Sequence, residues 1–409
     1  MTVLEARTRV GGRVEQVDAG VGRPVQLGGE VVGPVHTAYL RLVEELGLTL
    51  EPSYVNVPGA TTYDFYEGIS RAADFPVRDG AEQADYERVE REWGTLVATV
   101  DPDDPWKHPE AGKLDRASIG QWLRSVDALP STVRRLEVGA LALADGSIEH
   151  SSLLAELRKS AAVGQRGFYS YELWESHQVA EGSAEVANRL AVELDERVRL
   201  EAEVSRVRVG HRCSVSLGSG EELTAEAVVC ALPAPVVRRV EIEGVHADRL
   251  RSLRSQRHAL AAKVVAVYER SVWSDTGSNG LAEGEHVLGS TWPQREGVLS
   301  ALVPPERLGY LLAVAGDDRD EVVRDELERM YGATARRTKA IYHRLWGVDP
   351  FTLGYVTHWW PGDVGRVGPL HGTHAPPFYV CGSDQWVAGY MEGAVSTGRS
   401  AASAVLAGS

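Results

Sequence analysis

The sequence predicts an α/β protein with two domains, and three observations support this. Its 409 residues exceed the roughly 250 to 300 residues at which a single hydrophobic core stops growing. Strand-like segments lie toward both ends of the chain, and a long stretch with helical spacing of apolar residues lies between them. The first residues form a short apolar strand that ends in an acidic residue and leads into a glycine-bearing turn. We therefore expect two hydrophobic cores with a cleft between them.

Hydrophobic periodicity places the individual elements of this fold. Residues 85–163 carry mostly helical spacing, and the small residues of 390–406 suit a helix that packs against a backbone or a flat ring. Further helices are expected at 36–46 and 319–331. Short apolar runs predict strands at 2–4, 204–209, 214–217, 227–231, 261–268 and 378–381.

Composition narrows the classes of partner. A formal net charge of -15 leaves no basic face for nucleic acid or for an anionic membrane surface. The three cysteines lack the spacing of a disulfide framework or a zinc site, and no apolar run is long enough to cross a bilayer. We expect a cytoplasmic protein that binds small molecules and no metal. A homodimer is compatible with this composition.

The strand that ends at Glu5 resembles the second strand of a Rossmann-like dinucleotide-binding unit. In that unit a carboxylate accepts hydrogen bonds from ribose hydroxyls, and the fingerprint glycines lie about 20 residues earlier. Such glycines would precede Met1. We therefore expect the first strand, glycine loop and first helix to be absent from this chain and encoded upstream. Taken alone, an apolar strand ending in Glu more often has only a structural role.

Glycines and arginines after Glu5 strengthen the nucleotide interpretation. Glycine pairs let backbone amides approach a pyrophosphate, and nearby arginines neutralise its charge. The residues concerned are Arg7, Arg9, Gly11, Gly12, Arg13, Gly28 and Gly29.

Lys263 lies in the middle of an apolar strand. An unpaired ammonium there would pay a large desolvation cost, so we expect a partner. The alternative is a lysine at a strand edge that reaches solvent.

Several motifs resemble those of the flavin-containing monoamine oxidase family. They are VLEAR at 3–7, RVGGR at 9–13, LGG at 27–29, VGP at 32–34, EELGL at 44–48 and GYMEGAV at 389–395. The resemblance spans nearly the whole chain and is weakest in the helical segment. It implies a two-domain FAD-binding fold of the glutathione-reductase type, with a substrate domain of mixed sheet and helices. The implied FAD domain comprises 1–50, 182–252 and 349–409, and the substrate domain comprises 51–181 and 253–348.

The resemblance also implies roles for single residues. Glu5 would bind the adenosine ribose, Arg13 would lie near the pyrophosphate, and the backbone of Val204 would contact the adenine. Near the other end of the cofactor, the implied contacts are Trp346, Gly382, Ser383, Asp384 at the ribityl chain, and the Met391 N–H at the flavin. Asp384 alone would more often be a helix N-cap.

The family's catalytic positions correspond to Lys263, Tyr355 and Tyr390. Lys263 would hold a water beside flavin N5 for reoxidation by O2, and the two tyrosines would flank the substrate amine. Either tyrosine alone would more often belong to the core. Gly354 stands where animal enzymes carry the cysteine that bonds covalently to flavin, so FAD is expected to bind noncovalently.

The implied activity is oxidation of an amine by hydride transfer to flavin N5. The imine would hydrolyse to a carbonyl product while O2 becomes hydrogen peroxide. An L-amino acid oxidase or a desaturase is the alternative within flavin enzymes, and an arginine facing the tyrosines would favour a carboxylate substrate. From a different class, the chain could be a non-catalytic binding or scaffold protein that has lost its cofactor.

Overall fold

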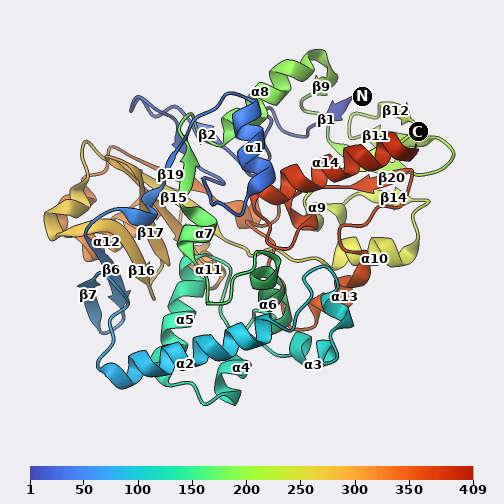
Figure 1. The fold of residues 1–409 in the computed structure, drawn as a ribbon. Helices are drawn as coiled ribbons and strands as arrows, with labels where there is room; N and C mark the ends of the chain where they lie inside the picture. Colours follow the sequence, from blue (N-terminus) through green and yellow to red (C-terminus); the bar gives the residue numbers. More distant parts are fainter. Residues whose placement is uncertain (409) are drawn as a thin grey trace.

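The computed structural model describes residues 1–408, and its largest element is a seven-stranded mixed sheet (Figure 1). Neighbouring strands run antiparallel except for one parallel pair, β16 with β6. The strand order is β19 (Ala340–Arg344), β15 (Ala262–Val267), β18 (Val298–Val303), β17 (Ser290–Arg295), β16 (Ser278–Gly284), β6 (Ala60–Phe65) and β7 (Gly68–Ala72).

Helix α12 (Arg319–Tyr331) packs its apolar side chains into one core with this sheet. Val323, Leu327 and Met330 of the helix are almost fully buried, because they recur at helical spacing on one face. The helix has the bounds expected from the sequence.

A second core lies within a group of helices at the lower edge of Figure 1. The segment expected to be mostly helical is confirmed as helical. Its helices are α2 (Gly80–Val97), α3 (Ala111–Arg116), α4 (Ile119–Ser125), α5 (Pro130–Ala142) and α6 (Leu153–Ala162).

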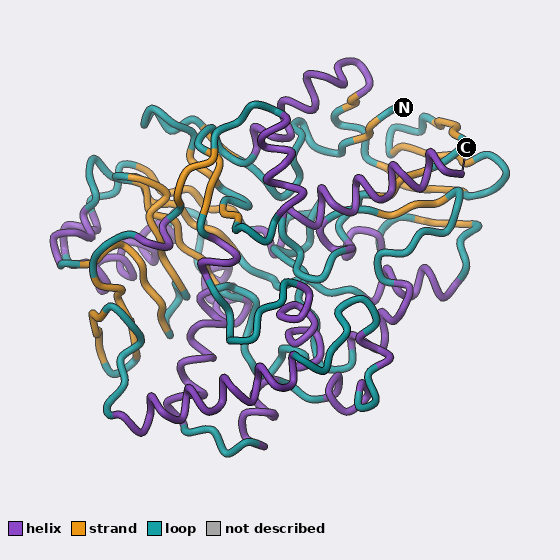
Figure 2. Tube along the Cα trace, in the orientation of Figure 1, coloured by secondary structure: helices purple, strands orange, loops and turns teal. Residues whose placement is uncertain are grey.

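Two pairs of parallel strands join segments that are far apart in the sequence. Strand β1 (Val3–Leu4) pairs with β9 (Val198–Arg199), and β13 (Val228–Cys230) pairs with β20 (Phe378–Val380). A four-stranded sheet lies nearby, in the order β12 (Glu222–Ala225), β11 (Cys213–Leu217), β10 (Val204–Arg208) and β14 (Glu241–Glu243). The long helix α14 (Met391–Gly408) passes along this region (Figure 2). Each of the two parallel pairings joins a strand near one end of the chain to a strand of the segment 198–230.

The remaining elements connect these parts. A three-stranded sheet has the order β4 (Val31–Val32), β8 (His177–Val179) and β5 (Leu50–Pro52), so β8 pairs with strands from the first 52 residues. The other strands are β2 (Gln16–Val17) and β3 (Val25–Gln26). The other α-helices are α1 (Thr37–Glu45), α7 (Tyr171–Glu175), α8 (Ala184–Leu194), α9 (Ala234–Val237), α10 (Ala247–Ser255), α11 (Pro305–Ala313) and α13 (Asp363–Val367).

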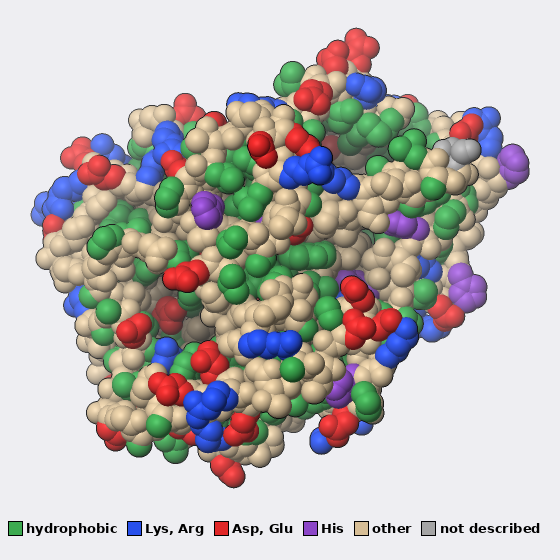
Figure 3. All heavy atoms as spheres, viewed as in Figure 1, with side chains coloured by type: hydrophobic (Ala, Val, Ile, Leu, Met, Phe, Trp, Pro, Cys, Tyr) green, Lys and Arg blue, Asp and Glu red, His purple; other side chains and the backbone are tan. Residues whose placement is uncertain are grey.

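Charged side chains of both signs are mixed over the face shown in Figure 3. Within residues 1–408, no helix is both long and apolar enough to span a membrane.

Candidate active site

One continuous cavity of about 1820 Å³ runs from the parallel strands to the seven-stranded sheet. Its volume exceeds the roughly 300 to 1,000 Å³ of ordinary ligand pockets, so it has room for a large cofactor and a second small molecule. Of the residues predicted from the sequence for this site, Arg9 and Asp384 are absent from its wall. The lining includes Glu5, Arg7, Gly11, Gly12, Arg13, Gly28, Gly29, Val204, Lys263, Trp346, Tyr355, Gly382, Ser383, Tyr390 and Met391.

Glycines and small residues leave one side of the cavity open for a flat ligand. A Cβ added to Gly12 or Gly398 would meet no heavy atom within 4 Å, so both positions face open space. Gly398 lies on α14 with Ala394 and Ala402 at four-residue spacing, and all three line the cavity. At Gly28, by contrast, a Cβ would lie 2.1 Å from the carbonyl oxygen of Arg13, so the close backbone approach requires glycine. This long, smooth cradle fits FAD.

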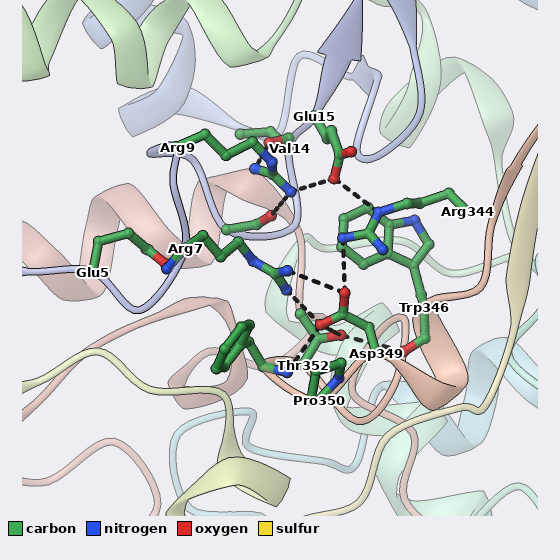
Figure 4. Close-up of polar contacts among 12 residues, drawn as sticks. Glu5, Arg7, Arg9, Val14, Glu15, Arg344, Trp346, Asp349, Pro350 and Thr352 are labelled. Carbon is green, nitrogen blue, oxygen red and sulfur yellow. Dashed lines mark hydrogen bonds and ion pairs between the residues drawn. The ribbon is translucent and has the colours of Figure 1, made fainter. Parts of the chain in front are cut away.

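Arg7 is held by a carboxylate rather than left free for a phosphate. Its guanidinium donates two hydrogen bonds to Asp349, at 3.1 and 2.5 Å, and Arg344 contacts the same carboxylate at 2.8 Å (Figure 4). Burial opposes ionisation of Asp349, but hydrogen bonds from Arg7 and Phe351 N–H, together with the charge of Arg344, lower its pKa to about 2. The Glu5 carboxylate accepts the Arg7 backbone N–H at 2.8 Å.

Arg9 has a local role in the turn that follows β1. Its guanidinium donates to the carbonyl groups of Val10, Gly12 and Val14 and pairs with Glu15. From the sequence we expected Arg9 to neutralise a pyrophosphate, whereas here its charge is paired with Glu15 and its donors hold the turn.

Arg13 is oriented by the segment that contains Ser383 and Asp384. Its Nη2 donates to Ser383 Oγ and to Asp384 Oδ1, each at 2.6 Å, and its Nη1 donates to the Tyr355 carbonyl oxygen at 3.3 Å. Arg13 lines the cavity, so these bonds hold it in place at the wall.

Asp384 is buried behind that wall and is saturated by protein donors. Oδ2 accepts the Ala234 N–H at 2.8 Å and lies 2.9 Å from His258 Nε2, while Oδ1 also accepts from the hydroxyl of Thr357. The charges of Arg13 and His258 and these hydrogen bonds outweigh the effect of burial and hold the Asp384 pKa well below its usual range. Asp384 therefore orients Arg13 and bonds the first residue of α9, rather than facing the cavity as expected.

Lys263 has the buried partner that the sequence required. Its side chain is 1% exposed, and Nζ donates to Glu30 Oε2 at 2.6 Å and to the Gly28 carbonyl oxygen at 3.1 Å. Because β15 lies between β18 and β19, the alternative of a lysine at a strand edge is wrong. Glu30 was not predicted as this partner, although it directly follows the Gly28 and Gly29 pair.

The aromatic end of the cavity contains Tyr355, Tyr390 and Trp346. The Tyr390 ring stacks on Trp174 with a centroid distance of 5.2 Å. Tyr355 borders a small apolar cluster that includes Trp292. Trp346 donates its ring N–H to the Leu27 carbonyl oxygen at 3.0 Å, which fixes its plane beside the glycine pair.

A carboxylate that the sequence analysis missed, Glu175, lies beside Tyr390. It accepts hydrogen bonds from the hydroxyls of Tyr54 and Tyr169, and the Tyr390 hydroxyl lies 3.4 Å from its Oε1. Burial raises the pKa of Glu175, while the tyrosine hydroxyls stabilise the charged form. The sequence feature that could have indicated Glu175 is the clustering of tyrosine and glutamate residues between 169 and 175.

Gly354 occupies a position that no larger residue can take. Its φ is +148°, and an added Cβ would lie 2.1 Å from the Cβ of His258. A cysteine at this position would require the backbone to move.

Comparison with known proteins identifies the family. The family model described as flavin containing amine oxidoreductase matches residues 1–406. The chain belongs to the flavin-containing amine oxidoreductases. The expectations of a flavin cofactor and of an oxidoreductase that acts on amines are thereby confirmed.

Individual relatives within this amine oxidoreductase family are similar along the whole chain. Putrescine oxidase from Kocuria rosea is 29% identical over 443 residues, covering 99% of this chain and 90% of its own length. Amine oxidase B from Rattus norvegicus is 26% identical, covering 99% and 81%. A solved triple mutant of putrescine oxidase superimposes with a TM-score of 0.90 at 26% identity, covering 100% of this chain and 93% of that one. This likeness confirms the α/β fold class.

Proposed function

We propose that this chain binds FAD noncovalently and oxidises the C–N bond of a small amine, with O2 as the electron acceptor. The observation that carries the proposal is the single cavity that joins a glycine-lined cradle to an aromatic slot. When bound, the flavin would accept a hydride from the amine's α-carbon and pass the electrons to O2, which yields hydrogen peroxide. The released imine hydrolyses to a carbonyl compound and ammonia or a smaller amine.

In this proposal the residues of the cradle bind and orient the cofactor. Glu5 accepts from the ribose of the adenosine half, Val204 contacts the adenine, and Arg13 supplies positive charge near the pyrophosphate. The bonds from Ser383 and Asp384 to Arg13 support that role, because a fixed guanidinium pays less entropy on binding an anion. The first N–H groups of α14, beginning at Met391, face the flavin end with the positive pole of the helix dipole.

In the slot, Tyr355 and Tyr390 orient the substrate amine between aromatic walls and exclude water. Lys263 positions a water at the flavin edge, and its pairing with Glu30 keeps the ammonium ordered. These roles follow from the family resemblance and from the shared cavity wall.

The surroundings of Tyr390 favour an amine over an amino acid. The polar partners of its hydroxyl are Tyr169 and Glu175, and the negative charge of Glu175 would repel a substrate carboxylate. The family match over residues 1–406 likewise does not favour a non-catalytic scaffold.

The purified protein tests this proposal directly. We expect a yellow protein whose colour passes entirely into the supernatant after acid precipitation, since Gly354 offers no thiol. Anaerobic addition of an aliphatic amine should bleach the flavin, and air should restore it with formation of hydrogen peroxide. Colour retained in the pellet would contradict noncovalent binding, and a flavin that no amine reduces would contradict the activity.

Cellular location and assembly form the remaining part of the proposal. The acidic charge and sparse cysteines support a cytoplasmic location. Light scattering coupled to size-exclusion chromatography measures whether the protein is a monomer or a homodimer.

A further inference from the structure

His258 connects the cofactor end of the cavity with the substrate slot. Its side chain is 0% exposed and does not line the cavity, so it acts only through its neighbours. The next residue, Ala259, donates its N–H to the Val356 carbonyl oxygen and accepts from the Tyr355 N–H, each at 2.8 Å. These backbone bonds fix His258 beside the segment that carries Tyr355.

One edge of the His258 ring faces the carboxylate that holds Arg13. Nε2 lies 2.9 Å from Asp384 Oδ2, while Asp384 Oδ1 accepts from Arg13 Nη2 at 2.6 Å. Asp384 is 2% exposed, so the two partners share a carboxylate that solvent barely reaches. Hydrogen bonds to an ionised group are short and strong, so His258 and Arg13 together fix the direction in which this carboxylate points.

The same ring packs against the backbone just before Tyr355. A Cβ built on Gly354 would lie 2.8 Å from both Cγ and Nδ1 of His258, so the ring occupies the space that a side chain would need. The carbonyl oxygen of Tyr355 accepts in turn from Arg13 Nη1 at 3.3 Å. The contacts therefore close into a circuit that runs through Arg13, Asp384, His258 and the Gly354–Tyr355 backbone.

The charge of this circuit depends on whether Arg13 holds an anion. Burial is the largest influence on His258 and lowers its pKa below the ordinary value, while Asp384 opposes this effect. The positive charges of Arg13 and Arg238 lower the pKa further. A pyrophosphate at Arg13 would bring negative charge to the same place, and nearby negative charge favours a protonated ring. A ring that is neutral before the cofactor binds can thus become an imidazolium afterwards.

On the segment of His258 itself, the neighbouring charge is already compensated. Arg257 Nε lies 2.9 Å from Asp363 Oδ2, so this ion pair holds its guanidinium. The groups left to respond to an anion at Arg13 are Asp384 and His258.

We propose that His258 is a positioning residue for the cofactor: it orients the carboxylate that holds Arg13, takes up a proton when the FAD pyrophosphate binds, and keeps Tyr355 in place at the slot. This inference rests on the proposed binding of FAD and specifies how the protein responds to it. The proton comes from solvent and is bound at a ring nitrogen. Because the FAD-bound state then holds more protons, FAD affinity should rise as the pH falls.

Proton uptake is measured by titrating FAD into the full chain, freed of flavin, in a calorimeter at neutral pH. Two buffers that differ in their heat of ionisation give the number of protons taken up. We expect the parent to take up a substantial fraction of one proton and to bind FAD several-fold more tightly at about pH 6 than at about pH 8, across the range in which histidine titrates.

Two substitutions separate the hydrogen bond of His258 from its titration. His258→Gln has an amide that still donates to Asp384, so it should keep the affinity at neutral pH within a few-fold and lose the proton uptake. His258→Phe fills the space against Gly354 but donates nothing, and should lose roughly 10-fold in FAD affinity. The matched control is His246→Gln, because His246 faces Asp248 at 3.5 Å on the surface; it should change neither quantity.

FAD binding without proton uptake, or equal uptake in the parent and His258→Gln, would overturn the proposal. If His258→Phe does not fold, these two proteins still decide the point. At full flavin saturation, anaerobic reduction by an amine should be slower in His258→Phe and close to the parental rate in His258→Gln, and equal rates in all three would refute the link to Tyr355. A chain that binds no FAD at any pH is a different result, which refutes the proposed cofactor itself.

Discussion

Lys263 Nζ and Glu30 Oε2 lie 2.6 Å apart, and both side chains are at most 2% exposed. The pair joins β15 of the seven-stranded sheet to the residue that follows the glycine pair of the cradle. The Trp292 ring N–H donates to the other Glu30 oxygen at 3.2 Å, so the carboxylate is held from two sides. The cofactor cradle and the seven-stranded sheet thus meet at this buried ion pair.

Removal of Glu30 should destabilise the protein strongly. Glu30→Ala leaves the Lys263 ammonium buried without its charge partner, and breaking such a pair costs about 3 to 5 kcal/mol. The measurement is the free energy of unfolding in urea. Asp275→Ala, which breaks the exposed pair with Arg270, is the control and should cost no more than about 1 kcal/mol. A loss of similar size in both variants would show that Lys263 relaxes to solvent.

Lys263→Met should slow reoxidation of the reduced flavin without loss of bound flavin. The variant removes the group proposed to hold a water at the flavin, and removing one preorganised donor costs on the order of 100-fold in rate. Mixing reduced enzyme with O2 and following flavin absorbance measures the step. Lys339→Met, at an exposed lysine paired with Glu269, serves as the control. An unchanged rate would exclude this role for Lys263.

Tyr390→Ala should reduce kcat/KM far more than Tyr390→Phe. Phenylalanine preserves the aromatic wall and loses only the bonds to Tyr169 and Glu175, whereas alanine opens the slot. Misplacing a reacting atom by about 1 Å costs on the order of 100-fold in rate. Because Tyr390 directly precedes α14, anaerobic flavin reduction must be compared at equal flavin content. Equal reduction rates in the parent and both variants would refute the aromatic slot.

Lowering the pH should reduce the free energy of unfolding because His371 is buried in its neutral form. Burial, and then the charge of Arg158, lower the His371 pKa from 6.5 to about 3. Its neutral ring lies 3.2 Å from Arg158 Nη1 through Nδ1 and 2.9 Å from the Asp384 carbonyl oxygen through Nε2. Because the folded-state pKa is the lower one, the unfolded chain takes up the proton first as pH falls. The contribution of the neutral His371 ring to the free energy of unfolding is therefore complete above pH 6.5 and is lost progressively as the pH falls from about 6.5 to about 3.

His371→Gln should flatten this dependence. At about 1.4 kcal/mol per pH unit, the parent should lose roughly 2 kcal/mol more than the variant between pH 6.5 and pH 5. Unfolding free energies in urea at each pH measure the difference. His211→Gln, at an exposed position, should keep the parental slope. If His371→Gln keeps the parental slope as well, the buried His371 ring does not cause the pH dependence of the unfolding free energy.

By itself the sequence determined those features that depend on local patterns. Apolar spacing at 3.6 residues places α12 at Arg319–Tyr331, and a lysine within an apolar strand requires a buried partner wherever that strand packs. The motifs near both ends identify the family, because they lie within short stretches of chain. Positions such as Gly28 were recognisable as sites of close backbone approach.

The tertiary structure alone decided which charges meet. Glu30 is 233 residues from Lys263, and Asp349 is 342 residues from Arg7, so no local pattern encodes either pair. Asp384 was predicted to contact the cofactor, but in the folded chain its carboxylate pairs with Arg13 and lies beside His258. Tyr171 of α7 donates to Glu283 on β16, 112 residues further along the chain, so no local pattern encodes that contact either. Ion pairs between distant residues depend on distances across the fold, and the packing of the chain sets those distances.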